Sequence, residues 1–294
     1  MKSLVSPFIF MLAIINVNGQ TTLQYNFEVD DTFSFKQTAE QVITQEFEGA
    51  SHEITNNIDG ILGFKVIASK EDSYELELEF KDLNLKMTSS IQGDLMNVKA
   101  SVIEEDNVQS KVFNSLLNTP VTLTLSKNGK ILSVQGGDSL VTRMVNASGL
   151  EDDFSLNMMK KSLEKEFGSK ALSESYEQMT YIYSDNAIRI GDTWKNNYTG
   201  KLAVENNWKL EELNETIAKI SGDANIIMSV SEPSSTMNLT GKQITQIITN
   251  ATSGLIQNMT IQGSSEGIST MAQLEGQEIP TTVKSIITYK LIQE

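Results

Sequence analysis

The sequence predicts an α+β protein, mainly β. We expect long, curved antiparallel strands in an open, half-barrel-like sheet, with a central helical segment packed on it. Two observations lead to this fold class. Apolar and polar residues alternate with a period of two over most of the chain, and helical spacing is confined to its middle. Strands with one apolar face are typical of antiparallel sheets that are buried on one side only.

The N-terminal strands show the alternation clearly. Residues 31–48 and residues 73–81 each place apolar side chains on one face and polar ones on the other. Residues 122–134 predict a hairpin whose turn contains Asn128 and Gly129. The apolar faces of the first two strands supply four candidate interior residues, Phe33, Phe35, Leu76 and Leu78.

Helical spacing appears only in the centre of the chain. Pro120 follows the first of these segments, and Gly168 ends the third, as expected of residues that stop helices. Acidic residues at 104–106 and 151–153 are interpreted as helix starts. The predicted helices are residues 104–117, 138–147, 151–167 and 170–179.

The C-terminal third returns to strands. Trp194 and Trp208 share one parity, and the last strand is expected near residues 282–292. Residues 29–33 are similar to residues 190–194, which leaves open an internal duplication or shared turn chemistry. The predicted organisation is a signal peptide at 1–19, a β-rich half at 20–137 that includes helix 104–117, a helical segment at 138–180 and a β-rich half at 181–294, the halves forming one continuous domain.

The first 19 residues predict a secretory signal peptide. Lys2 precedes an apolar run from Leu4 to Ile15, and cleavage is expected between Gly19 and Gln20. The run is shorter than the roughly 20 residues of a membrane-spanning helix, so we expect a periplasmic or extracellular chain with no membrane span. The absence of cysteine excludes anchoring through a lipid-modified cysteine and favours a bacterial exported protein.

The amino-acid composition limits the classes of partner that we expect this protein to bind. The net charge of −15 argues against nucleic-acid binding, because an acidic surface repels phosphate backbones. Hydrophobic residues make up 39% of the chain, which is enough for a real core. Asn-x-Ser/Thr sequons occur about as often as chance predicts for this composition. These sequons are Asn146, Asn197, Asn214, Asn238, Asn250 and Asn258.

Candidate catalytic groups are scarce. His52 is the only histidine, and without cysteine this excludes most His-based triads and all thiol nucleophiles. Glu75, Glu77 and Glu79 line one strand face, where a solvated acidic surface is the simpler interpretation and a calcium site the alternative. We therefore predict a non-enzymatic protein with no catalytic residue, no metal and no cofactor.

Several short segments together are similar to a known family. They are Asp31–Phe35, Leu117–Val121, Tyr176–Met179, Gly191–Trp194 and Tyr289–Leu291. With the predicted leader, the chain resembles an uncharacterised family of exported proteins found mainly in Bacteroidetes-type bacteria and known as a domain of unknown function. The resemblance implies export and a β-rich fold, and it transfers no activity and no site residue.

The function predicted from these observations is an exported cell-envelope protein that binds an apolar or lipid-like ligand between sheet and helices. Twelve methionines, amphipathic helices and the missing catalytic set motivate it. The alternative is an envelope structural or protein-interaction module that binds an envelope protein partner and no small ligand. A hydrolase that uses carboxylates alone is the least favoured hypothesis. The candidate lining is Phe33, Phe35, Leu76, Leu78, Phe113, Met158, Met159, Trp194 and Trp208.

Overall fold

The computed structural model describes residues 19–200, 202–232 and 234–292, so the predicted signal peptide, apart from Gly19, lies outside the described residues. Within them the chain forms strands, then helices, then strands. The first strands are β1 (Thr32–Phe47), β2 (Ala50–Ser69), β3 (Ser73–Ser89), β4 (Gly93–Lys99), β5 (Val121–Ser126) and β6 (Ile131–Gln135). The later strands are β7 (Thr193–Tyr198), β8 (Leu202–Leu213), β9 (Ile217–Glu232), β10 (Ser235–Asn250), β11 (Ile256–Met271) and β12 (Glu278–Ile292). The helices are α1 (Val108–Asn114), α2 (Gly137–Ala147), α3 (Asp153–Phe167), α4 (Ser169–Thr180) and the short 3₁₀ helix η1 (Ala272–Leu274).

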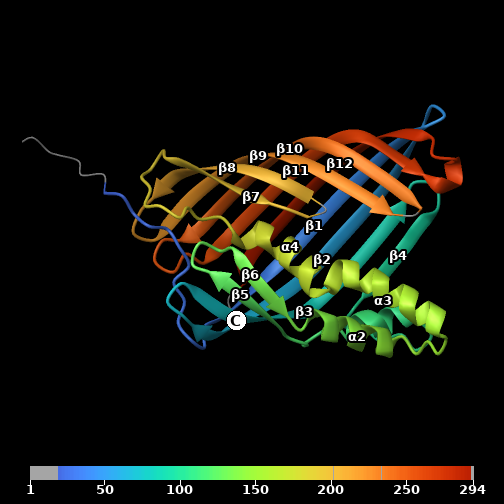
Figure 1. The fold of residues 1–294 in the computed structure, drawn as a ribbon, viewed down its shortest axis with the longest axis horizontal. Helices are drawn as coiled ribbons and strands as arrows, with labels where there is room; N and C mark the ends of the chain where they lie inside the picture. The colour runs from blue at the N-terminus through green and yellow to red at the C-terminus, as the bar shows by residue number, and fades with distance from the viewer. Residues whose placement is uncertain (1–18, 201, 233, 293–294) are drawn as a thin grey trace, which may run out of the picture.

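All described strands join one antiparallel sheet, in the order β6-β5-β3-β2-β1-β12-β11-β10-β9-β8-β7, with β4 paired to β3. The first and last long strands, β1 and β12, pair in the middle of this order and so join the two halves of the chain. Among the described strands, β6 and β7 lie at opposite edges and do not pair with each other. The sheet is therefore open, and Figure 1 shows its long, twisted strands.

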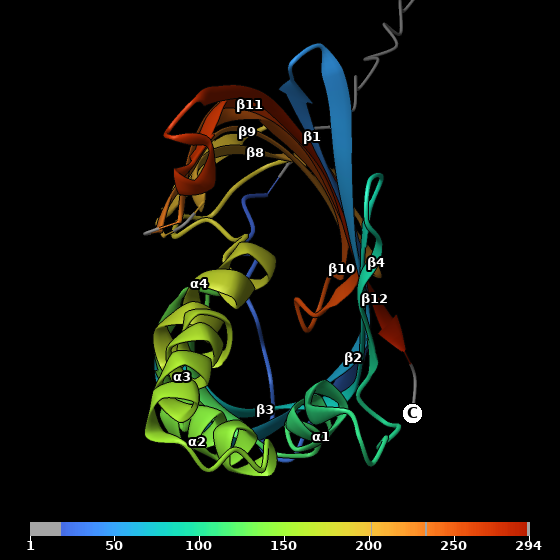
Figure 2. The ribbon, with the colours of Figure 1, turned by 90° about the vertical axis from the view of Figure 1, so that its right-hand side faces the viewer.

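The helices lie across the open side of the curved sheet, as the end-on view in Figure 2 shows. Helix α4 packs against β6 at one edge and also contacts β7 at the other, while α3 packs against α2 and α4. The fold class predicted from the sequence is confirmed: the protein is mainly β, with one open antiparallel sheet and a central helix against it.

Helix α1 begins later than the sequence predicted. Asn107 caps it by accepting a hydrogen bond from the Ser110 backbone N–H at 3.2 Å. Glu104 lies before this cap, where its backbone oxygen accepts from the Asn107 N–H at 3.1 Å. The interpretation of residues 104–106 as a helix start is therefore wrong, because the capping amide stops the helix short of them.

The predicted hairpin between β5 and β6 is confirmed, and because the Ser126 N–H donates to the Lys130 oxygen at 2.9 Å, its loop is the three residues 127–129. The Gly129 N–H donates to the Ser126 oxygen at 2.9 Å, and Gly129 itself has a φ of +95°. This is a type I turn followed by a left-handed residue, a common hairpin loop that favours glycine at its last position. Asn128 donates from its side chain to Asp185 at 2.6 Å, which ties the turn to the segment after α4.

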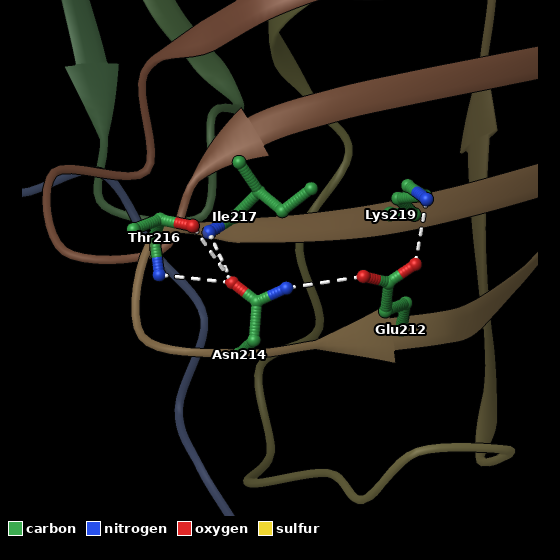
Figure 3. A network of polar contacts seen from close by, with 5 residues as sticks. All are labelled: Glu212, Asn214, Thr216, Ile217 and Lys219. Atoms are coloured by element: carbon green, nitrogen blue, oxygen red, sulfur yellow. Dashed lines mark hydrogen bonds and ion pairs between the residues drawn. The ribbon is translucent and has the colours of Figure 1, made fainter.

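Two of the sequon asparagines organise turns. In the β8–β9 turn, the Asn214 side-chain oxygen accepts from the backbone N–H groups of Thr216 and Ile217, both at 3.0 Å (Figure 3). Its amide donates to Glu212, which also pairs with Lys219. In the same way, Asn250 accepts from two backbone N–H groups in the β10–β11 turn. Turn formation thus accounts for these two asparagines.

The N-terminal segment, residues 20–31, crosses one end of the interior. Thr21 pairs with Ile188, the Tyr25 N–H donates to the Lys127 oxygen at 2.8 Å, and the Asp30 N–H donates to the Val66 oxygen at 2.9 Å. The segment thereby bridges the chain before β7, the β5–β6 turn and strand β2. It buries three side chains inside the fold, Leu23, Tyr25 and Phe27.

Candidate functional site

The surface of the sheet that faces the helices carries one Asp, Glu, Lys or Arg at the paired positions of its described strands, Glu232 at the end of β9, which pairs with Lys165 of α3. On β1, for example, Phe35 is in register with Leu62, and Leu62 with Phe80, which contacts Phe167 of α3. When the register is followed across the bulges, the other residues on this face of the paired strands are not Asp, Glu, Lys or Arg, and the remaining charged strand residues occupy the opposite face. We call this face, which is uncharged apart from Glu232, the inner surface.

One end of the inner surface is tightly packed. Tyr25 and Phe27 from the N-terminal segment contact each other with ring centroids 5.2 Å apart, and Phe33 and Phe64 stack at 5.4 Å. The Tyr25 hydroxyl donates to the Thr180 oxygen at 3.0 Å, at the end of α4. The cavity left among these rings is only about 20 Å³, room for a single water molecule at most. This end therefore holds no ligand-sized space.

Buried phenols give the fold a pH dependence. Burial raises the pKa of Tyr25, Tyr176, Tyr183, Tyr198 and Tyr289 above the ordinary value. The unfolded chain releases these protons near pH 10 whereas the folded chain keeps them, so the stability they contribute is constant below pH 10 and falls as pH rises above it. We expect tyrosinate absorbance and loss of circular dichroism to appear together in an alkaline titration. Ionisation of most tyrosines with the dichroism unchanged would contradict this.

The inner surface changes character away from the packed end. Ile287, Ala39, Ile58 and Leu85 lie in one cross-strand row over β12, β1, β2 and β3, and all four are only partly buried. Because neighbouring strands are about 4.8 Å apart, this row is roughly 14 Å long. We call it the inner strip. Solvent reaches apolar side chains here, on the face where a packed core would bury them completely.

Helix α3 presents a second apolar stripe that is incompletely buried. Leu163 is its only described residue that is fully buried, while Leu156, Met159 and Phe167 on the same stripe are partly exposed. Lys165 pairs with Glu232 at the end of β9, so α3 reaches the strands on the far side of the opening. Figure 2 shows α3 across the interior from β1 and β2. The helix and the sheet therefore present two apolar surfaces to one interior.

Neutral polar groups follow the inner strip toward the open end. The Asn56 amide donates to the Gln41 side-chain oxygen at 3.1 Å, and the Gln45 amide donates to the Ser269 hydroxyl at 3.0 Å. The side-chain oxygen of Asn56, Oδ1, is buried and has no hydrogen-bond partner. His52 contacts the Ser89 hydroxyl at 2.9 Å on the same face. An apolar strip therefore leads to side-chain amides, a hydroxyl and an imidazole that can hydrogen-bond.

The nine side chains that the sequence predicted as the lining of a ligand site differ in their burial in the structure. Phe35, Leu76, Leu78, Trp194 and Trp208 are buried in the core. Phe33, Phe113 and Met159 are partly buried against it. Met158 is 55% exposed and, at 100° per residue, lies on the other side of α3 from Leu163, so it does not line the interior. The sequence missed the inner strip and the neutral polar groups beside it.

The two tryptophans have structural partners. The Trp208 indole N–H donates to the Asn196 side-chain oxygen at 2.9 Å, and Asn206 donates to the same oxygen at 3.1 Å. The Trp194 indole N–H donates to the Ile182 backbone oxygen at 3.0 Å. The Trp208 indole thus ties β8 to β7, and the Trp194 indole ties β7 to the chain after α4. Because both indoles are satisfied within the fold, they offer no free donor to a ligand.

The acidic strand residues lie on the outer face. Glu75 pairs with Lys70 at 2.5 Å, and within the described residues no group of three or more His, Asp or Glu side chains is placed to hold a metal ion. In the same part of the chain, no helix has the length and apolarity needed to traverse a bilayer.

The chain belongs to a family of unknown function, DUF6263, whose model matches residues 71–256. No curated protein matches it. Among solved structures, it is similar to a lipovitellin chain, from a structure of lipid–protein interactions in lipovitellin, with 10% identity and a TM-score of 0.48 over 91% of this chain and 26% of that chain. The chain thus spans about a quarter of the lipovitellin chain. An outer membrane channel from Pseudomonas putida F1 is 9% identical, with a TM-score of 0.26 over 91% of this chain and 97% of that chain. These comparisons establish the family and assign no activity.

Proposed function

We propose that this protein is an exported, non-enzymatic envelope protein that binds an apolar, lipid-like ligand between the inner strip and helix α3. The ligand lies with its hydrocarbon part along the strip, and its polar end is neutral and hydrogen-bonding. The predicted leader at residues 1–19 supports export. The inner surface supports a ligand without formal charge, since its one Asp, Glu, Lys or Arg residue, Glu232, is paired with Lys165 of α3 and no other such residue on it would compensate a buried ion.

The observation that carries this proposal is the pair of apolar surfaces left partly exposed. Helix α3 has 15 residues and fully buries only one of them. Opposite it, the four aliphatic residues of the inner strip are only partly buried. Apolar area on both surfaces therefore remains in contact with water. Burying such apolar area contributes roughly 25 cal/mol per Å² of favourable free energy. A hydrocarbon chain that covered these surfaces would therefore be bound by apolar burial that folding alone does not achieve. Ligand sites typically combine apolar walls with a few neutral polar groups.

A charge placed on the inner strip tests the proposal. Ile58→Glu is expected to abolish binding of a fluorescent fatty-acid probe and of a monoacylglycerol competitor, because the new carboxylate would be desolvated by the ligand. Ile244→Glu is the matched control, since Ile244 is 58% exposed on the outer face. Both variants should retain the wild-type circular dichroism. Equal probe binding by both, or none by the wild-type protein, would exclude the proposed site.

A specific observation also favours the protein-interaction alternative. Phe154 is 76% exposed and Met158 55% exposed, and helical geometry places both on the side of α3 away from the interior. An exposed aromatic residue beside an exposed methionine is typical of a docking surface for another protein. If Phe154→Ser with Met158→Ser leaves lipid binding unchanged but removes an envelope protein partner, the interaction role is supported independently of the ligand.

A further inference from the structure

A second site lies outside the inner surface. An open pocket of about 770 Å³ between α1, α2 and β3 is lined by Lys81, Lys111 and Arg143, and no acidic residue belongs to its lining. The chain as a whole has a net charge of −15 and only two arginines, of which Arg143 is one. Three basic residues around one pocket with no acidic residue therefore contrast with the net negative charge of the chain.

We propose that this pocket binds the phosphate group of a small organic phosphate. The Arg143 side chain is held in place because its Nε donates to the Ser115 backbone oxygen at 3.0 Å. Its terminal N–H groups are of the kind that bind phosphate oxygens in pairs, and Lys111 adds a point charge. An organic anion fits better than bare phosphate, because Leu117 and the 58% exposed Ile103 also line the pocket.

Asn118 supports a preformed site. It is one of the few non-glycine residues with a positive φ, +52°, and its backbone N–H donates to the Phe80 oxygen at 2.9 Å. This left-handed conformation is tolerated by asparagine and fixes where its side chain starts. The residue therefore brings an amide to the pocket wall at a position set by the backbone.

A soluble ligand agrees better with the surroundings than a membrane surface does. Glu104, Glu105 and Asp106 follow Ile103 directly and are all exposed. A flat anionic bilayer that reached the pocket would also approach these carboxylates, and the repulsion would oppose binding. A small organic phosphate can enter the pocket among the three basic residues without approaching these carboxylates.

Calorimetric titration of the full mature chain with phenyl phosphate tests the proposal, with inorganic phosphate and phenol as partial probes. We expect saturable binding of phenyl phosphate, weaker binding of inorganic phosphate, no binding of phenol, and loss of affinity with added salt. Arg143→Gln and Lys111→Gln should each weaken binding about tenfold, the equivalent of one charge-assisted hydrogen bond. Asn118→Gly keeps the backbone conformation and should weaken binding less.

Lys219→Gln removes the same charge far from the pocket and is the matched control. It should bind phenyl phosphate like the wild-type chain, and unchanged melting temperatures should show that all variants are folded. The proposal is overturned if phenyl phosphate gives no saturable heat at millimolar concentration, or if Lys219→Gln weakens binding as much as Arg143→Gln. Binding only to phosphatidylglycerol vesicles, and not to phenyl phosphate, would likewise overturn it in favour of a lipid headgroup.

Discussion

Gly129→Ala is expected to destabilise the protein by about 4 kcal/mol, a large part of the roughly 5–15 kcal/mol that folded domains have. Gly129 has a φ of +95°, and a Cβ atom there would lie 1.8 Å from the Thr180 backbone oxygen. The positive φ alone costs about 1–2 kcal/mol for alanine. The clash adds to this because the obstructing atom is backbone, and no side-chain rotation can relieve it. Urea unfolding followed by tryptophan fluorescence measures the effect.

Gly49→Ala separates the two causes. Gly49 also has a positive φ, +78°, but a Cβ atom there would have nothing within 4 Å. We expect this control to lose only about 1–2 kcal/mol. The difference between the two variants then reports how tightly the β5–β6 turn is held against the end of α4 and the ring of Tyr25, which together close one end of the interior. Equal unfolding midpoints would show that this end is not close-packed.

Ala39→Trp is expected to remove ligand binding while changing stability by about 1 kcal/mol or less. Ala39 is the smallest member of the inner strip and is only partly buried, so an indole at this position would occupy the space proposed for the hydrocarbon chain. In a close-packed core the same substitution would cost several kcal/mol. Stability and fluorescent fatty-acid binding, measured on the same sample, distinguish these two situations.

Glu40→Trp is the matched control for this substitution. Glu40 is the next residue on β1, so its side chain points to the opposite face of the sheet, and it is exposed. We expect it to bind the probe like the wild-type protein. If Ala39→Trp binds the probe as well as Glu40→Trp does, the ligand does not lie on the inner strip. If Ala39→Trp unfolds the protein, the strip is part of the packed core.

Much of the fold follows from local patterns in the sequence. The two-residue alternation correctly placed Tyr74 and Phe80 on one face, because a strand buried on one side must alternate. It also gave Trp194 and Trp208 the same face, although the structure places them on separate strands, β7 and β8. Gly168 ends α3 as predicted. The start of α1 was mispredicted because the acidic residues at 104–106 favour a helix start as much as the true cap at Asn107 does.

The candidate site was harder to predict because exposure on the inner surface depends on contacts distant in sequence. Phe35 and Ala39 share a face of β1, yet of the two only Phe35 lines the small cavity at the packed end, with the aromatic residues of the N-terminal segment and with Met179 of α4. The residues near Ala39 in the sequence do not indicate that its side chain stays partly exposed in the fold. One signal was present: Gln41 and Gln45 share the parity of Phe35, and neutral amides on an otherwise apolar face indicate that this part of the face is not ordinary core.

Native mass spectrometry tests the central claim most directly. The mature chain would be purified without detergent from a Gram-negative periplasm, measured intact, and then extracted with organic solvent. A single lipid-sized adduct in a one-to-one ratio, lost in Ala39→Trp and retained in Glu40→Trp, is the predicted result, and the extract would identify the ligand. A bare polypeptide mass that does not change when fatty acid or monoacylglycerol is added would contradict the proposed function.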